Sequence, residues 1–151
     1  MSRSAVGWAW VAGQVVLLVA LVVVPGRDDW PTPAWLRLVA QVVFVTGIAV
    51  LIVASLRLGR ALTPTPVPTS SGQLQTGGLY RYVRHPIYSG VLLIVVGITL
   101  RSGSFAVLAL AVATVVFFDR KARWEEARLA ERYPGYAEYA ARTPRFVPRP
   151  R

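Results

Sequence analysis

The chain has 151 residues, of which 54% are hydrophobic and 16% charged, against a charged share of about 25% in ordinary soluble domains. This composition excludes an average soluble domain, and also a disordered chain, which would be rich in charge and poor in apolar residues. The lack of cysteine excludes disulfides, zinc–thiolate sites and thiol catalysis, and a single histidine excludes a multi-histidine metal site. A net charge of +10 is typical both of nucleic-acid binders and of membrane proteins with cytoplasmic arginines.

Two long apolar segments lie in the N-terminal part of the chain. Residues 5–24 carry no charge and, at about 1.5 Å per residue, would cover about 30 Å, the hydrocarbon thickness of a bilayer. A signal peptide is the alternative, but no clear cleavage site follows and more apolar segments come later. Residues 34–56 form a second candidate span, in which Gln41, Thr46 and Gly47 are of the small or polar kind that helix contacts in lipid prefer.

Two shorter apolar runs follow, at residues 87–100 and 104–118. The Arg-Ser-Gly connection between them predicts a helical hairpin, whose helices we expect to continue beyond the apolar runs on the inner side. Because each run has about fifteen residues, below the roughly 20 residues of a usual span, a re-entrant hairpin is the alternative.

Helical structure is expected to continue after Asp119. Residues 120–132 are strong helix formers, the Tyr-Pro-Gly step that follows ends that helix, and residues 136–141 allow one more short helix. The sequence thus predicts an all-α integral membrane protein of one domain, residues 1–151, with four transmembrane helices and a cytosolic C-terminal helical segment.

The positions of the charges agree with this topology. Four arginines and no acid lie in the loop at residues 57–86, and nine basic residues follow the fourth apolar run. With four spans, the N-terminus, this loop and the C-terminal segment share one side of the membrane. The excess of arginine identifies that side as the cytoplasm, as expected for a bacterial inner-membrane protein, and favours the membrane over nucleic acid as the partner.

Polar residues concentrate in two segments. In the first, residues 72–90, tyrosines surround Arg84 and His85, and Pro86 fits the first position of a helix whose N-terminus suits a carboxylate. An anchor that contacts lipid phosphates is the alternative. In the second, residues 119–139, Glu125 and Glu126 lie just beyond the fourth span, and the alternative is a solvated helix with weak ion pairs.

Both segments together resemble a known family. The string GGLYRYVRHPIYSG resembles the GxYxxxRHPxYxG signature of the isoprenylcysteine carboxyl methyltransferases, which related phospholipid N-methyltransferases share. The string EEARLAERYPGYAEYAARTPRFVP is similar to the C-terminal signature of the same family. The resemblance covers residues 72–148, about half of the chain, and implies an integral-membrane methyltransferase that uses S-adenosylmethionine and releases S-adenosylhomocysteine.

The resemblance also implies which residues form the site. Those that would line the cofactor are Gly72, Gln73, Leu74, Gln75, Tyr80, His85, Pro86, Ile87 and Tyr88. Glu125 or its neighbour Glu126 corresponds to a glutamate on the substrate side. An arginine that precedes this glutamate in the family has no single counterpart, because strict spacing falls on Lys121. Arg120 and Arg123, on either side, are therefore the candidates.

A lipid-like acceptor is expected because a soluble substrate would not need a membrane protein. A carboxylate is ionised at neutral pH and needs no general base, whereas an amine must first lose a proton, which a glutamate could accept. The arginine-rich surroundings favour an isoprenoid or prenylcysteine carboxylate. The alternatives are N-methylation of a phospholipid amine and a non-catalytic scaffold that binds anionic lipid. No metal is expected, and the oligomeric state is not predicted.

Overall fold

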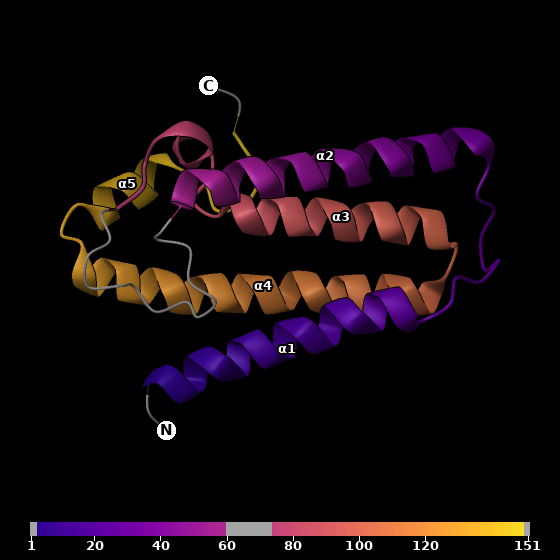
Figure 1. Ribbon diagram of the computed structural model, residues 1–151, viewed down its shortest axis with the longest axis horizontal. Coiled ribbons are helices and arrows are strands. Elements are labelled where there is room, and N and C mark those ends of the chain that lie inside the picture. Colours follow the sequence, from indigo (N-terminus) through magenta and orange to yellow (C-terminus); the bar gives the residue numbers. More distant parts are fainter. Residues whose placement is uncertain (1–2, 60–73, 150–151) are drawn as a thin grey trace.

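The computed structural model describes residues 3–59 and 74–149, which are all-helical (Figure 1). The elements in chain order are α1 (Arg3–Val23), α2 (Ala34–Leu58), the 3₁₀ turn η2 (Gly78–Arg81), α3 (Pro86–Ser102), α4 (Phe105–Arg132) and α5 (Tyr136–Arg142). The four long helices run side by side, with α2 against α3 and α1 against α4, and α5 lies at one end of the bundle (Figure 1). The predicted all-α fold and the helical hairpin are confirmed.

Two of the four predicted spans, α1 from Ser4 and α2, are long and apolar enough to cross a membrane. Only 11% and 17% of their most apolar stretches are buried inside the protein, whereas the core helix of a soluble protein would be mostly buried. Large side chains such as Val22 and Leu56 are about three-quarters exposed, at 76% and 75%. So much contiguous exposed apolar surface is typical of a membrane or partner interface. Helix α3 is apolar but shorter, at 17 residues, and α4 runs without a break from the fourth apolar run into the charged segment.

Helices α2 and α3 touch along a row of small residues. A Cβ atom on Gly47 would lie 2.7 Å from the backbone nitrogen of Ile94 and 2.8 Å from the carbonyl oxygen of Gly90. A Cβ atom on Gly97 would lie 2.8 Å from the carbonyl oxygen of Ala40. In lipid, where apolar helices gain little by leaving the solvent, such close backbone packing drives helix association. Of the three α2 residues predicted to mediate contacts, Gly47 does so, whereas Gln41 and Thr46 are exposed.

At the end of the bundle opposite α5, the loop after α1 is fastened to the connection between α3 and α4. The backbone N–H of Asp29 donates to the carbonyl of Gly103 at 2.9 Å, and its carboxylate accepts from the N–H of Phe105 at 2.8 Å. Asp29 therefore caps α4 from another segment. Gly103 has a φ of +60°, the left-handed conformation that ends α3 and that a side chain would oppose. These contacts fix α1 to the hairpin.

We expect Gly47→Ala to lower the free energy of unfolding by about 1–3 kcal/mol, because the new methyl group meets backbone atoms that cannot yield. Thermal unfolding in detergent measures this. Gly135→Ala is the matched control, since a Cβ atom there meets nothing within 4 Å and its φ is −81°. Equal stability of the two variants would contradict the tight contact between α2 and α3.

Candidate functional site

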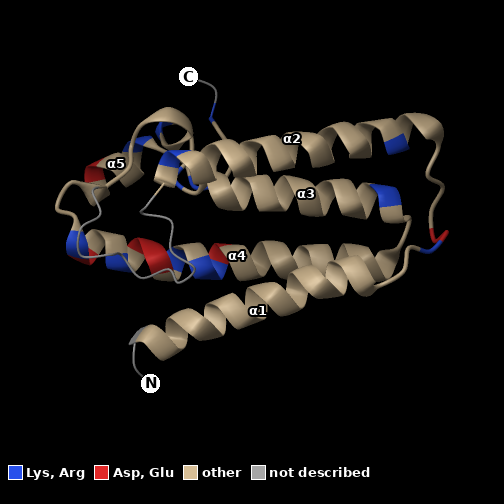
Figure 2. Ribbon diagram, viewed as in Figure 1, with Lys and Arg blue, Asp and Glu red and all other residues tan. Residues whose placement is uncertain are grey.

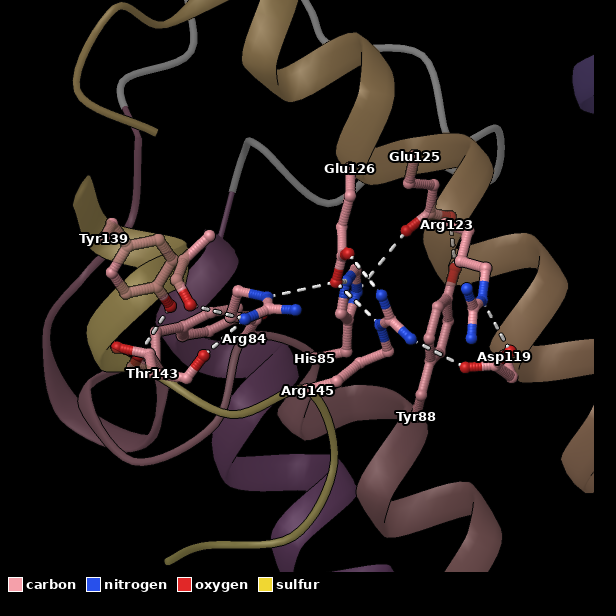
Figure 3. Close-up of polar contacts among 12 residues, drawn as sticks. Arg84, His85, Tyr88, Asp119, Arg123, Glu125, Glu126, Tyr139, Thr143 and Arg145 are labelled. Atoms are coloured by element: carbon pink, nitrogen blue, oxygen red, sulfur yellow. Dashed lines mark hydrogen bonds and ion pairs between the residues drawn. The ribbon is translucent and has the colours of Figure 1, made fainter. Parts of the chain in front are cut away.

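The two polar segments of the sequence meet at the α5 end of the bundle, where charged residues are concentrated along the ribbon (Figure 2). Pro86 begins α3 as predicted, and His85 is the buried residue that precedes it. Glu125 and Glu126 come from the facing part of α4. The site is therefore built from the start of α3, the second half of α4, α5 and the segment after α5 (Figure 3).

The segment after α5 lies alongside the start of α3. The backbone N–H of Arg84 donates to the carbonyl of Pro144 at 2.8 Å, and that of His85 to the carbonyl of Arg145 at 3.1 Å. The hydroxyl of Ser89 donates to the carbonyl of Phe146 at 2.7 Å. This C-terminal segment is thus a wall of the site, which brings Arg145 into it.

Arg84 fastens α5 to the same place. Its Nη1 donates to the carbonyls of Ala140 and Thr143 at 2.8 and 2.5 Å, where a cation also suits the negative end of the helix dipole. The hydroxyl of Tyr139 donates to the carbonyl of Tyr80 at 2.5 Å. The position of helix α5 at this end of the bundle is therefore set by the polar contacts of Arg84 and Tyr139.

Glu126 is the centre of a cluster with Arg84, His85 and Arg145, called here the Glu126 cluster. Its Oε1 accepts from Arg84 Nε at 3.0 Å, from His85 Nε2 at 3.0 Å and from Arg145 Nε at 2.9 Å, and its Oε2 accepts from Arg145 Nη2 at 2.7 Å. Although burial opposes ionisation, these donors hold the pKa of Glu126 well below its ordinary value. The paired contact with Arg145 has the fixed geometry of a guanidinium–carboxylate fork. Glu126 is therefore ionised at neutral pH, and its contacts tie the start of α3 and the C-terminal segment to α4.

Glu125 has different surroundings. The hydroxyl of Tyr88 donates to its Oε1, and His85 Nδ1 lies 3.6 Å from its Oε2. Burial raises the pKa of Glu125 above its ordinary value, against the opposing charges of His85 and Lys121. The ring of Tyr88 stacks parallel to that of His85, with centroids 5.2 Å apart. Of the two glutamates, Glu125 thus has fewer cationic partners than Glu126, and it lies beside the rings of Tyr88 and His85.

Lys121 is the basic residue that the structure places beside Glu125. Its side chain is buried, its Nζ lies 5.1 Å from the centre of the Tyr88 ring, and burial lowers its pKa although Glu125 opposes the shift. The predicted candidates Arg120 and Arg123 are both exposed. The side chain of Arg123, 64% exposed, pairs with Asp119 at 2.8 Å. Within residues 3–59 and 74–149, no ion pair joins either arginine to Glu125 or Glu126.

The residues expected to line the cofactor are brought together in part. Tyr80, His85, Pro86 and Tyr88 are buried or half-buried near the two glutamates, and Ile87 is half-buried on the first turn of α3. Burial, with smaller contributions from Tyr139 and Glu125, raises the pKa of Tyr80 to about 12. Leu74 is half-buried and Gln75 is exposed, whereas Gly72 and Gln73 lie outside the described residues.

Sequence reasoning missed two residues of this site. Arg145 lies in a proline- and arginine-rich stretch with no periodic pattern, and its Nη1 also pairs with Asp119 at 2.7 Å. Gln14 lies in the first apolar segment, and its Oε1 accepts from Lys121 Nζ at 2.6 Å. The signal for Gln14 was a lone carboxamide in an otherwise apolar helix, since polar residues in such helices often have a function.

Comparisons with known proteins agree with a methyltransferase of membranes. The model of the phospholipid methyltransferase family matches residues 35–135, and the chain belongs to this family, whose members use S-adenosylmethionine. The match runs from α2 to the step after α4 and leaves α1 outside.

Two curated relatives are similar to the chain. The cobalt-zinc-cadmium resistance protein CzcN of Cupriavidus metallidurans is 43% identical over 77 residues, which are 50% of this chain and 36% of that protein. The nickel-cobalt-cadmium resistance protein NccN of Alcaligenes xylosoxydans xylosoxydans is 28% identical over 136 residues, 89% of this chain and 62% of that protein. The chain thus spans about a third and three-fifths of their lengths.

We expect Glu126→Gln to lower the free energy of unfolding by about 3–5 kcal/mol, because it leaves Arg84 and Arg145 partly buried without their shared anion. Glu125→Gln is the matched control and should cost much less, since burial already favours the neutral form of that side chain. Unfolding of both variants in the same detergent measures the difference. Equal losses of unfolding free energy in the two variants would contradict the assignment of the stabilising ion pairs to Glu126 alone.

The acid stability of the protein should follow Glu126. Because its folded pKa lies below the ordinary value of 4.5, its carboxylate contributes stability above pH 4.5, and that contribution is lost as the pH falls further. The unfolding temperature should therefore drop between about pH 5 and about pH 3. In Glu126→Gln this drop should be smaller, although Asp119, whose pKa its arginine partners also lower against the effect of burial, retains part of it. A profile as steep as that of the wild type would contradict the assignment.

Proposed function

We propose that this protein is an integral-membrane methyltransferase that transfers the methyl group of S-adenosylmethionine to the polar end of a lipid-like acceptor. Family membership supports the reaction class. The observation that carries the acceptor side is the presence of the buried Lys121 and the half-buried Glu125 one turn apart on α4.

The proposed topology has four spans, with both termini and the loop at residues 57–86 on the cytoplasmic side. At about 1.5 Å per residue, α3 covers about 26 Å, and Glu125 lies about 30 Å along α4 from Phe105. The apolar part of α4 ends at Phe118, about 20 Å along the helix, so Glu125 would lie about 10 Å beyond it, at the inner membrane face. The charged residues at the α5 end of the bundle support the same orientation (Figure 2).

The residues at the site fit the cofactor. The ring of Tyr88 already lies 5.1 Å from the ammonium of Lys121, and the buried ring of Tyr80 nearby could offer a similar face to a sulfonium cation. The hydroxyl of Tyr136 is buried and has no hydrogen-bond partner within residues 3–59 and 74–149, so it can serve a polar group of the cofactor. When bound, S-adenosylmethionine supplies an activated methyl group. Proximity and alignment of the acceptor are then what the protein has to contribute.

A carboxylate acceptor is the first candidate. The bond that forms joins a carboxylate oxygen to the methyl carbon, the carbon–sulfur bond breaks, and no proton has to move. Lys121 is a buried cation beside Glu125 and can hold such a carboxylate, whereas the guanidiniums of Arg84 and Arg145 are already paired with Glu126. An isoprenoid or prenylcysteine carboxylate combines this anion with an apolar chain that the bilayer can supply.

A phospholipid amine is the second candidate, and Glu125 favours it. A carboxylate whose pKa burial raises is a better base at neutral pH than an ordinary one. It could accept the proton of an ammonium headgroup before the nitrogen attacks the methyl carbon. The phosphate of such a lipid would still suit Lys121, so both candidates need the same two side chains.

The names of the two relatives refer to resistance to metals. Within the described part of this chain, no group of three or more His, Cys, Asp or Glu residues could hold a metal ion. We therefore propose lipid methylation rather than metal binding for this chain.

The proposal is tested by calorimetric titration with S-adenosylhomocysteine and by a labelled-methyl assay on prenyl carboxylates and on phosphatidylethanolamine. We expect saturable binding in the wild type and in Glu125→Gln, with dissociation constants within about twofold. Glu125→Gln should slow transfer to an amine by about 10²-fold or more, because a general base is lost. Its effect on transfer to a carboxylate should be much smaller.

The matched control is Glu138→Gln on α5, where the glutamate side chain is 75% exposed. It should change neither binding nor transfer. Absence of S-adenosylhomocysteine binding in folded protein would overturn the proposal and favour the anionic-lipid scaffold. Full transfer to both acceptors in Glu125→Gln would remove Glu125 from the reaction.

A further inference from the structure

We propose that α1 forms part of the acceptor site, and that Gln14 positions the ammonium of Lys121 to bind an anionic group of the acceptor, a carboxylate or a phosphate. The inference rests on the proposed function for the identity of the ligand. It concerns a helix that lies outside the residues matched by the family.

The contact between Gln14 and Lys121 joins residues 107 positions apart. Gln14 Oε1 accepts a hydrogen bond from Lys121 Nζ at 2.6 Å, and Lys121 is only 4% exposed. Gln14 is the one carboxamide, hydroxyl or charged side chain in residues 5–24. A carboxamide in an apolar helix is costly unless it forms a hydrogen bond, so the contact gives this residue a reason to be there.

The packing of α1 on α4 brings the two side chains together. A Cβ atom on Gly13 would lie 2.8 Å from Phe117 Cε2, so the helices approach closely one residue before Gln14. The ring of Trp10 meets that of Phe117 edge to face, with centroids 5.1 Å apart. The position of Gln14 is therefore fixed by neighbours on its own helix, and its oxygen is a fixed acceptor.

A neutral partner makes Lys121 different from the other cations of the site. Arg84, Arg123 and Arg145 each form an ion pair with a carboxylate. Lys121 forms none within the described residues, and Gln14 is the hydrogen-bond acceptor that those residues give it. A carboxamide fixes an ammonium without cancelling its charge. Lys121 therefore stays a buried cation that can attract an anion, with donors besides the one that Gln14 occupies.

Three groups that face Lys121 influence the pKa of its ammonium. They are Tyr88 from α3, whose ring lies 5.1 Å from Nζ, Glu125 from its own helix, and the neutral Gln14 from α1. Loss of the Gln14 acceptor removes a group that favours the charged form of Lys121. A carboxylate in its place would favour the charged form more strongly but would also neutralise it.

The first arm of the test needs no methyl transfer. Lys121 is the only lysine of the chain, so lysine labelled with ¹³C at Cε gives one side-chain resonance. We expect its titration midpoint to fall by about one unit in Gln14→Leu and to rise by a similar amount in Gln14→Glu. Gln41→Leu is the matched control, the same exchange at an exposed position of another apolar helix, and should leave the midpoint unchanged.

The second arm measures transfer to prenyl carboxylates and to phosphatidylethanolamine. Both Gln14→Leu and Gln14→Glu should raise KM for the acceptor about tenfold with kcat within about threefold, because one removes the acceptor that holds the ammonium in position and the other neutralises its charge. A purely structural contact would not give opposite midpoint shifts with the same change in KM. The acceptor whose KM rises identifies the anion as a carboxylate or a phosphate.

Two results would overturn the inference. A Lys121 resonance that titrates alike in the wild type, Gln14→Leu and Gln14→Glu would show that Gln14 does not act on Lys121. Shifted midpoints with an unchanged KM for every acceptor would show that the contact does not serve acceptor binding. Absence of both S-adenosylhomocysteine binding and transfer in the wild type would instead overturn the proposed function, and the acceptor role with it, while the midpoints would still report the contact.

Discussion

The fold of the site depends on one half-buried carboxylate, that of Glu126. Glu126 accepts hydrogen bonds from Arg84, His85 and Arg145, which come from the segment before α3 and the segment after α5. Without this anion the two segments would bring cations together in a region of low dielectric constant, and they would repel each other. The Glu126 cluster therefore holds the start of α3 against α4, and it leaves the neighbouring Glu125 free to face the aromatic rings and Lys121.

The sequence predicted the helices well because the physical signal was strong and local. Long apolar stretches, a glycine turn and a Pro-Gly step are enough to place α1, α2, the hairpin and α5. The division of work between Glu125 and Glu126 was not predictable, because neighbours on a helix point about 100° apart and only the tertiary partners show which one is neutralised. For the same reason, spacing alone could not choose among Arg120, Lys121 and Arg123. The contributions of Arg145 and Gln14 depend on contacts across 19 and 107 residues, and a single sequence does not show the partner, although the lone carboxamide of an apolar segment marks Gln14 as unusual.

The two ends of the bundle are built in different ways. At the hairpin end, backbone groups and the carboxylate of Asp29 fasten the loop after α1 to the α3–α4 connection. At the α5 end, charged side chains meet on top of an apolar body. Between the two ends, α2 and α3 touch along glycines. The start of α3 is therefore fixed both by α2 and by the Glu126 cluster. In the proposed methyl transfer, a fixed start of α3 would help to align the acceptor with the cofactor.

The lateness of Arg145 in the chain has a consequence for biosynthesis. Glu126 lies on α4 and Arg145 lies on the segment after α5, so the Glu126 cluster cannot form before this last segment has been made. Only the arrival of the segment at residues 143–146 buries Glu126 and covers His85. The site is therefore completed last, after the residues of all four long helices have been made.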